Sequence, residues 1–119
     1  MIYTYKLKSY VNASHAMRWE SGQGKAHNHT WEIVAELSTT DGMVAFVDLE
    51  KEIQAVLHGL SGKFLNDLPA FATINPSVEN VTRYLFDAIA HTLEVHNAKL
   101  LRLEVSDSPT RSFCMDVRG

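Results

Sequence analysis

Residues 27–38 read HNHTWEIVAELS, and this stretch decides the fold. Its apolar members recur at every second position: Trp31, Ile33, Ala35 and Leu37. Such alternation, with aromatic and β-branched residues among its members, predicts a β-strand with one buried face. Because side chains two residues apart in a strand point to the same side, His27 and His29 are expected on one face, with Cα atoms about 6.5 Å apart. Two imidazoles at this spacing can meet one metal ion.

The segment before this strand predicts a second one. Residues 2–17 alternate between apolar and polar, with a slip after Leu7 that indicates a bulge. Residues 18–25 contain the two glycines of Ser21–Gly24, which are typical of a flexible loop. On the other side, Thr39–Gly42 includes Asp-Gly and predicts a turn. These features predict two strands joined by a loop.

Two helices are expected in the middle of the chain. The first has apolar residues at spacings of three and four, begins at Asp48, which can cap it, and ends near Gly59 or Gly62. The second begins at Asn75–Ser77, with the proline in its first turn, and ends near His96. An apolar stripe along a helix has to be buried against another element.

The chain is expected to close with two more strands. Leu101–Val105 and Phe113–Val117 alternate on either side of a turn at Ser106–Thr110. The predicted element order is ββααββ, in the α+β class, with a single domain over residues 1–119. Two helices cover only one face of a sheet, so the other face must be polar or pack against another subunit, which favours a homo-oligomer.

The composition limits the possible partners and compartments. The formal charge of −3 and the scattered lysines and arginines provide no basic surface for nucleic acid. No continuous apolar run suits a membrane span or a signal peptide, so no membrane contact and a cytoplasmic location are expected. Cys114 is the only cysteine, which excludes an intramolecular disulfide and a cysteine-based structural zinc site. It is expected to be a small buried hydrophobe.

Histidine is the residue type that points to chemistry. Three nitrogen ligands with one open position make a catalytic zinc site, so His27 and His29 need a third histidine. His15 is the nearest candidate, because it lies at the far end of the preceding strand and can pair beside the start of the next. The alternative is that these are partly exposed histidines beside a loop, as is common for an isolated His-x-His. The remaining histidines have no partner at metal-ligand spacing: His58, His91 and His96.

Several short motifs follow one another along the chain. They are Asn-Ala-Ser-His at 12–15, His-Asn-His-Thr-Trp at 27–31, Gly-Met-Val at 42–44, Phe-Val-Asp-Leu at 46–49, Phe-Leu-Asn-Asp-Leu-Pro at 64–69 and Asn-Pro-Ser-Val-Glu-Asn at 75–80. Each is a weak pattern alone. In this order they resemble the 6-pyruvoyltetrahydropterin synthase and 6-carboxytetrahydropterin synthase family, over nearly the whole chain. The resemblance implies a T-fold-like architecture, with a four-stranded antiparallel sheet and two helices on one face.

The resemblance also implies a metal and an assembly. In the family three histidines bind zinc, and the matching residues here are His15, His27 and His29. Family members form closed rings, often two trimers stacked into a hexamer, so a trimer or a hexamer is expected. The reaction implied is that of a lyase.

The family substrate is dihydroneopterin triphosphate, so a small-molecule pterin is the expected partner. A carboxylate holds the amino-pyrimidine edge of the pterin, and Asp107 stands at that position, one methylene shorter. A turn role for Asp107 before Pro109 fits the local chemistry equally well. Ser77 lies in a matching motif and is implied as a second substrate-binding residue.

The chain departs from the family at the residues that move protons. Where the family has a cysteine and an Asp-His pair, this chain has Gln23, Ser61 and Gly62. A glutamine amide does not titrate near neutral pH and glycine has no side chain, so the usual general base is absent. Glu20 is a candidate replacement, and a solvated loop carboxylate is the simpler interpretation.

Hypotheses from different classes therefore stay open. The first is a zinc-dependent pterin enzyme with altered chemistry, acting on dihydroneopterin triphosphate or a related pterin. The second is a non-catalytic homologue that binds metal or pterin and has a structural role. A zinc hydrolase acting on another small heterocycle is a third option.

Overall fold

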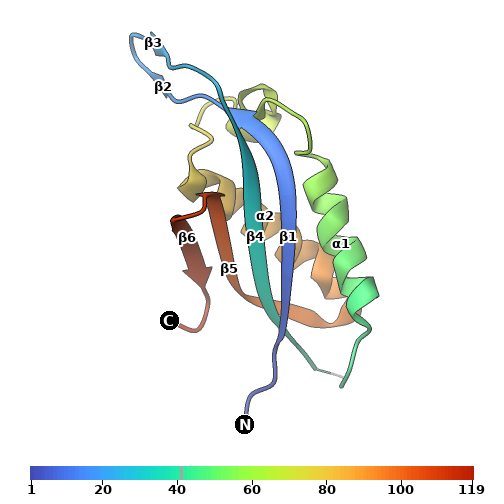
Figure 1. Cartoon of the computed structure of the whole chain (residues 1–119). Coiled ribbons are helices and arrows are strands. Elements are labelled where there is room, and N and C mark those ends of the chain that lie inside the picture. Colours follow the sequence, from blue (N-terminus) through green and yellow to red (C-terminus); the bar gives the residue numbers. More distant parts are fainter. Residues whose placement is uncertain (41) are drawn as a thin grey trace.

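The chain forms an antiparallel sheet with two helices on one face, which confirms the predicted fold (Figure 1). The computed structural model describes residues 1–40 and 42–119. The strand order of the main sheet is β1-β4-β5-β6. The strands are β1 Tyr5–His15, β2 Arg18–Trp19, β3 Gly22–Gln23, β4 His27–Thr39, β5 Ala98–Ser108 and β6 Arg111–Asp116. The α-helices are α1 Phe46–His58 and α2 Val78–Leu93, with short 3₁₀ turns at Leu65–Asp67, Pro69–Phe71 and Glu94–His96.

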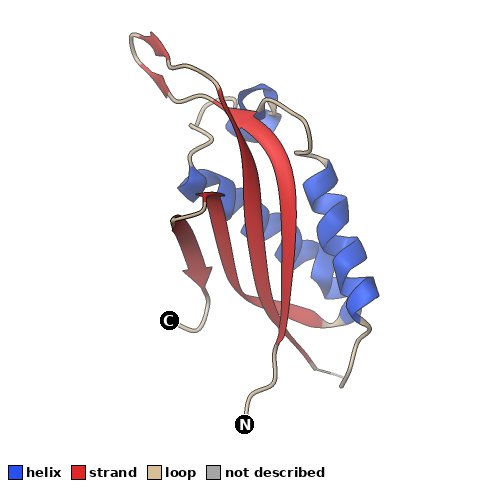
Figure 2. Ribbon diagram, in the orientation of Figure 1, coloured by secondary structure: helices blue, strands red, loops and turns tan. Residues whose placement is uncertain are grey.

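The core lies between the sheet and the helices, which share one side of it (Figure 2). Alternate residues of β1 and β4 are buried on this covered face. Each helix contributes residues spaced by three and four: Leu49, Ile53 and Leu57 from α1, and Val81, Leu85, Ile89 and Leu93 from α2. Burying one such side chain contributes about 1.5–3 kcal/mol to the free energy of unfolding.

The uncovered face of the sheet is polar, which was one of the two expected outcomes. Arg102 contacts Glu104 at 2.9 Å and Asp116 at 3.5 Å. Arg118 contacts Asp116 at 2.9 Å and Glu36 at 3.1 Å. Of these contacts, that between Arg102 and Asp116 joins neighbouring strands, and pairs of this kind stabilise a sheet modestly.

The N-terminal strands differ from the prediction in two details. The expected bulge is absent, because β1 pairs with β4 in one register throughout, and Ser9 rather than Tyr10 takes the buried position. Tyr10 lies on the uncovered face, where its hydroxyl donates to Glu32 at 3.0 Å. The predicted loop at 18–25 contains a small hairpin of β2 and β3, which projects beyond the end of the sheet (Figure 1).

The helix starts also differ from the prediction. α1 begins after Ala45, whose carbonyl accepts a hydrogen bond from the amide of Asp48, so Asp48 lies in the first turn and does not cap the helix. An acidic residue there still interacts favourably with the helix dipole. Ser77 caps α2 through its side-chain oxygen, and Pro76 therefore precedes the helix instead of lying in its first turn.

Cys114 is not the buried hydrophobe that the sequence predicts. Phe113 lies opposite Val105, and Met115 lies opposite Leu103, so both face the covered side. The residue between them faces the other way, and Cys114 is half-buried on the uncovered face.

The predicted turn at 39–42 and the expected absence of a membrane-spanning helix can be compared with the structure only within the described residues. The predicted Thr39–Gly42 turn includes Asp41, which lies outside the described residues. Within residues 1–40 and 42–119, no helix is both long and apolar enough to span a membrane.

Candidate metal-binding site

The strand register brings the N-terminal histidines to one end of the sheet. β1 and β4 pair antiparallel, and His15 lies opposite His27 in their last pair. His29 lies two residues further along β4, on the same face. These histidines continue the buried alternation of Ala13 and Trp31, so they lie on the covered face of the sheet.

His15 is buried and oriented by a backbone carbonyl. Its Nδ1 is 2.7 Å from the carbonyl oxygen of Pro76, the residue before the α2 cap. Because a carbonyl only accepts, Nδ1 donates and carries the ring proton. In the neutral ring the lone pair is then on Nε2. Histidines that bind a metal through one ring nitrogen usually donate a hydrogen bond from the other, as Nδ1 does here.

Trp31 forms the wall behind two of the histidines. It is almost fully buried, and its ring centroid is 5.1 Å from that of His15 and 5.9 Å from that of His29. Its Nε1 donates to the carbonyl of Ala13 at 3.1 Å. The indole therefore positions both imidazoles. In the sequence, Trp31 was interpreted only as a member of the alternating pattern. Its position two residues after His29 indicates that both side chains lie on the same face of the strand.

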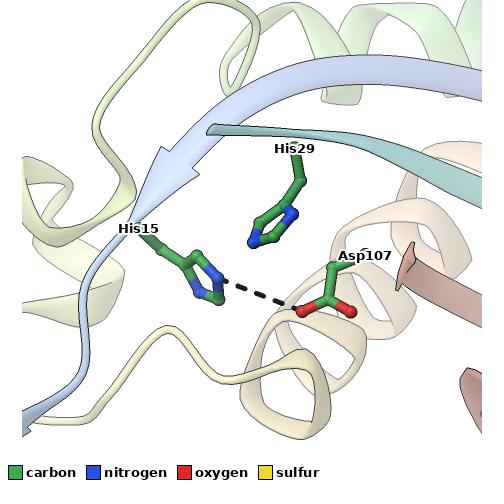
Figure 3. A group of neighbouring side chains, drawn as sticks. All are labelled: His15, His29 and Asp107. Carbon is green, nitrogen blue, oxygen red and sulfur yellow. Dashed lines mark ion pairs between the residues drawn. The ribbon is translucent and has the colours of Figure 1, made fainter. Parts of the chain in front are cut away.

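Asp107 reaches the histidines from β5. Val105 faces the core opposite Ile33, so Asp107, two residues further along, lies on the covered face as well. Its Oδ2 is 4.0 Å from Nε2 of His15 (Figure 3). One ligand atom from each of His15, His29 and Asp107 lies within 4.8 Å of the other two. We call these residues the inner cluster.

His27 lies beside the inner cluster and is not one of its members. Its side chain is exposed, and its ring centroid is 6.2 Å from that of His29. Among the described residues, the structure brings together two of the three predicted metal ligands and adds Asp107 to them.

The protonation of His29 suits a metal ligand. Burial lowers its pKa, His15 and His27 lower it further, and Asp107 acts in the opposite direction. The neutral imidazole, which is the form that binds metals, is therefore favoured near neutral pH.

The inner cluster fits a zinc ion. Imidazole nitrogen and carboxylate oxygen are both zinc ligands. Nε2 of His15 and Oδ2 of Asp107 carry lone pairs and face each other at 4.0 Å. In a tetrahedral site with zinc–ligand bonds of about 2 Å, ligand atoms lie roughly 3.3 Å apart, so these two side chains would have to move slightly closer to share the ion. With a neutral His15 ring, a cation between the two atoms would attract both of them.

Two pockets open beside Asp107, with volumes of about 480 Å³ and about 520 Å³. The smaller pocket is lined by His15, Met17, Ser77, Val78, Glu79, Asp107, Arg111, Ser112 and Phe113. The larger is lined by Tyr10, Asn28, His29, Thr30, Glu32, Ser106, Asp107, Ser108 and Pro109. Both volumes are typical of small-molecule sites.

The smaller pocket contains one predicted substrate-binding residue besides Asp107, and two charged residues that were missed. Ser77 lines it, although its side-chain oxygen also caps α2. Glu79 and Arg111 are exposed and add one charge of each sign. The signal for Glu79 was its place in the motif at 75–80. No sequence signal marked Arg111, because a turn does not reveal which side chains face a pocket.

The residues at the family's proton-transfer positions are not among those described as lining either pocket. Gln23 is exposed in β3, and Ser61 and Gly62 follow the end of α1. Gly62 has a left-handed φ of 72°, and its amide donates to the carbonyl of Asn12 at 2.7 Å. Its role in this chain is therefore to shape the backbone after α1.

The comparisons with known proteins agree with this architecture. A family model described as 6-pyruvoyl tetrahydropterin synthase matches residues 4–117. No curated protein matches the chain significantly.

Solved structures of such synthases have the same fold. The enzyme from Caenorhabditis elegans has a TM-score of 0.81 and 22% identity, over 96% of this chain and 94% of that one. The Plasmodium falciparum enzyme has a TM-score of 0.70 and 14% identity, over 94% and 96%. A Plasmodium vivax enzyme, described as a mutant in which a catalytic glutamate is replaced by alanine, has a TM-score of 0.70 and 13% identity, over 96% and 98%.

Proposed function

The chain belongs to the 6-pyruvoyl tetrahydropterin synthase family, and on this premise we propose that it is a zinc-dependent pterin enzyme with altered chemistry. Its substrate in this proposal is dihydroneopterin triphosphate or a related pterin. The observation that carries the proposal is the convergence of His15, His29 and Asp107 beside a pocket of about 480 Å³.

The residues that hold the zinc ion in this proposal are His15, His27 and His29. They come from the paired ends of β1 and β4. The Pro76 carbonyl sets the tautomer of His15, and Trp31 limits the rotation of its ring. When bound, zinc supplies Lewis acidity toward a hydroxyl or carbonyl oxygen of the substrate.

The smaller pocket combines apolar surface with one basic residue, Arg111, and two acidic residues, Glu79 and Asp107. Phe113 and Met17 provide apolar surface for the rings, and Ser77 provides a polar group for orientation. Arg111 is the one arginine or lysine among its described lining residues, and it provides positive charge for a phosphate group. Local charge of this kind is needed because the chain as a whole is negative.

Proton transfer in this proposal needs a residue other than the family's cysteine. The amide of Gln23 cannot take a proton from carbon at neutral pH. Glu20 is the candidate for this role; it lies exposed in the turn between β2 and β3, and the linings of the two pockets beside Asp107 do not include it. A glutamate is also described as catalytic in the Plasmodium vivax synthase. Glu20→Gln is expected to lower turnover by about 100-fold or more without changing zinc content.

The proposal is tested by incubating the zinc-loaded protein with dihydroneopterin triphosphate and with dihydroneopterin, and by separating the products by chromatography. We expect a new pterin product from at least one of them, and none from His15→Ala. An absence of product from both substrates with fully loaded protein contradicts the enzyme proposal.

A second candidate is a homologue that binds metal or pterin without turnover. It is favoured by one observation: Gln23, Ser61 and Gly62 supply no titratable group at the proton-transfer positions. It predicts that a pterin binds in calorimetry and is recovered unchanged. Measurable conversion of the bound pterin excludes this candidate.

The sheet edges support a homo-oligomer, and we propose a trimer or a hexamer. In the described sheet, β1 and β6 are the outer strands. The end of β1 is bonded to residues 62–64 through Asn12 and Ser14, and the rest of its outer side pairs with no other strand of the described chain. Edges of this kind can pair between copies and close a ring. Light scattering on the purified protein is expected to give three or six times the chain mass, and a stable monomer contradicts the proposal.

A further inference from the structure

We propose that Asp107 is a ligand of the metal ion and not the group that holds the heterocycle. This inference rests on the proposed zinc site, and it changes the role that the sequence suggests for this residue. The observation behind it is that Asp107 shares the inner cluster with His15 and His29, whose ligand atoms lie within 4.8 Å of one another.

The hydrogen bonding of His15 supports this role for Asp107. Nδ1 of His15 donates to the Pro76 carbonyl, so in the neutral ring the unprotonated Nε2 is the atom that faces Asp107. With the ring neutral, these two atoms have no proton between them at 4.0 Å and can share a cation. The inner cluster therefore provides two nitrogens and one carboxylate oxygen around a shared centre.

The surroundings of Asp107 leave its carboxylate available to interact with a bound cation. Its side chain is only 22% exposed, and that of His15 is 10% exposed, so water screens the pair poorly. In the described chain, no lysine or arginine forms an ion pair with Asp107, and the contact with His15 is an ion pair only when that ring is protonated. With a neutral His15, this half-buried carboxylate has no fixed cation and can accept one from outside.

The inference has a consequence for the chemistry of the site. Three histidines leave one open position on zinc, whereas His15, His27 and His29 together with Asp107 make a closed set of four. In that set, Asp107 would occupy the position through which zinc would otherwise act on a substrate oxygen. With Asp107 bound to the metal, Glu79 is the carboxylate of the smaller pocket that remains available to contact the substrate.

Metal binding to the full chain tests this assignment, with Zn²⁺ and Co²⁺ as probes. Competition with a chelator gives the Zn²⁺ affinity, and the visible absorption of bound Co²⁺ reports the ligand set. We expect Asp107→Asn to weaken Zn²⁺ binding by about 100-fold or more, above the usual cost of losing an outer contact of a metal site, and to change the Co²⁺ spectrum. Glu79→Gln removes the same charge from the same pocket and is expected to change neither quantity.

A second variant makes the test independent of the asparagine amide. Asp107→Ala is expected to lose the same affinity, and added acetate is expected to restore part of the Co²⁺ spectrum. If Asp107→Asn and Asp107→Ala both bind Zn²⁺ and Co²⁺ as the unmodified chain does, the assignment of Asp107 is overturned and the proposed zinc site stands. If the unmodified chain binds neither ion, the proposed function itself fails.

Discussion

The two faces of the same sheet carry polar clusters that differ in their charge balance. On the uncovered face, Arg118 lies 2.9 Å from Asp116 and 3.1 Å from Glu36, so opposite charges meet directly. On the covered face, Nε2 of His15 and Oδ2 of Asp107 are 4.0 Å apart. In the described chain, neither lysine nor arginine pairs with that carboxylate. The outer cluster is satisfied by its own residues, whereas the inner cluster brings together ligand atoms that could hold a cation.

The two clusters also differ in how strongly water screens them. The side chain of Arg118 is 40% exposed, compared with 10% for His15. Exposed ion pairs contribute little to stability, and charges shielded from water interact more strongly. Under the proposed function, the polar residues on the covered face hold the metal, and those on the uncovered face mainly pair with one another.

The largest effect is expected from removing the imidazoles of the proposed zinc site. A structural zinc site contributes about 10–16 kcal/mol, so the loss of one ligand among three or four is expected to weaken binding by roughly 1,000-fold. We expect this for His15→Ala, His29→Ala and His27→Ala, measured as zinc affinity by competition with a chelator.

His91→Ala is the matched control, because this histidine is exposed near the end of α2. It is expected to leave zinc binding unchanged. Stoichiometric zinc in His27→Ala would remove His27 from the ligand set and leave the inner cluster as the site.

The next largest effect is expected from Trp31, which connects the core to the inner cluster. Trp31→Ala is expected to lower the free energy of unfolding by about 3–5 kcal/mol, because it leaves a large cavity. Trp31→Phe keeps most of the volume and loses the hydrogen bond to Ala13, which costs about 1 kcal/mol. Urea unfolding of the metal-free proteins measures both. If Trp31→Ala stays folded and binds zinc with full affinity, the indole does not position the histidines.

The sequence predicted the elements of this fold well where the signal is local. The alternation at 27–38 corresponds to β4, His27–Thr39, and Gly59 is the C-cap of α1. The bulge near Tyr10 was wrong because an exposed tyrosine looks like a buried one in a pattern of hydrophobicity. Its hydroxyl bonds to Glu32, a residue of another strand.

The site could be predicted only in part, because it combines residues from three strands. The spacing of His27 and His29 gives their shared face, and the length of β1 brings His15 near them. The distance from Asp107 to His15 depends on the register of β5 against β4, in which Glu32 lies opposite Ser106. No local pattern in the sequence gives this register, so the approach of Asp107 to His15 could not be predicted, and the family resemblance alone suggested a substrate-binding role for Asp107.

A smaller effect is expected from the titration of His29 in the metal-free protein. Burial and the nearby His15 keep its pKa below 6.5, the usual value that it has in the unfolded chain. Between these two pKa values the unfolded chain binds more protons, so the free energy of unfolding rises with pH. Urea unfolding between about pH 5 and 8 with a chelator present measures this slope. His29→Gln is expected to flatten it and His91→Gln is not, and an equal slope in all three proteins would contradict the prediction.

The smallest effect is expected on the uncovered face. Hydrogen bonds from Arg118 hold the pKa of Asp116 well below its usual range. The stabilisation by this pair is therefore present above the unfolded pKa of about 3.9 and is lost as the pH falls through the lower folded value. Asp116→Asn is expected to lower the unfolding midpoint only slightly at pH 7, because the pair is exposed. High salt screens the pair and is expected to make this change smaller still. Its zinc affinity is expected to equal that of the unmodified chain, since Asp116 lies on the opposite face from the inner cluster, and a loss of affinity would mean that the two faces are coupled through the strands.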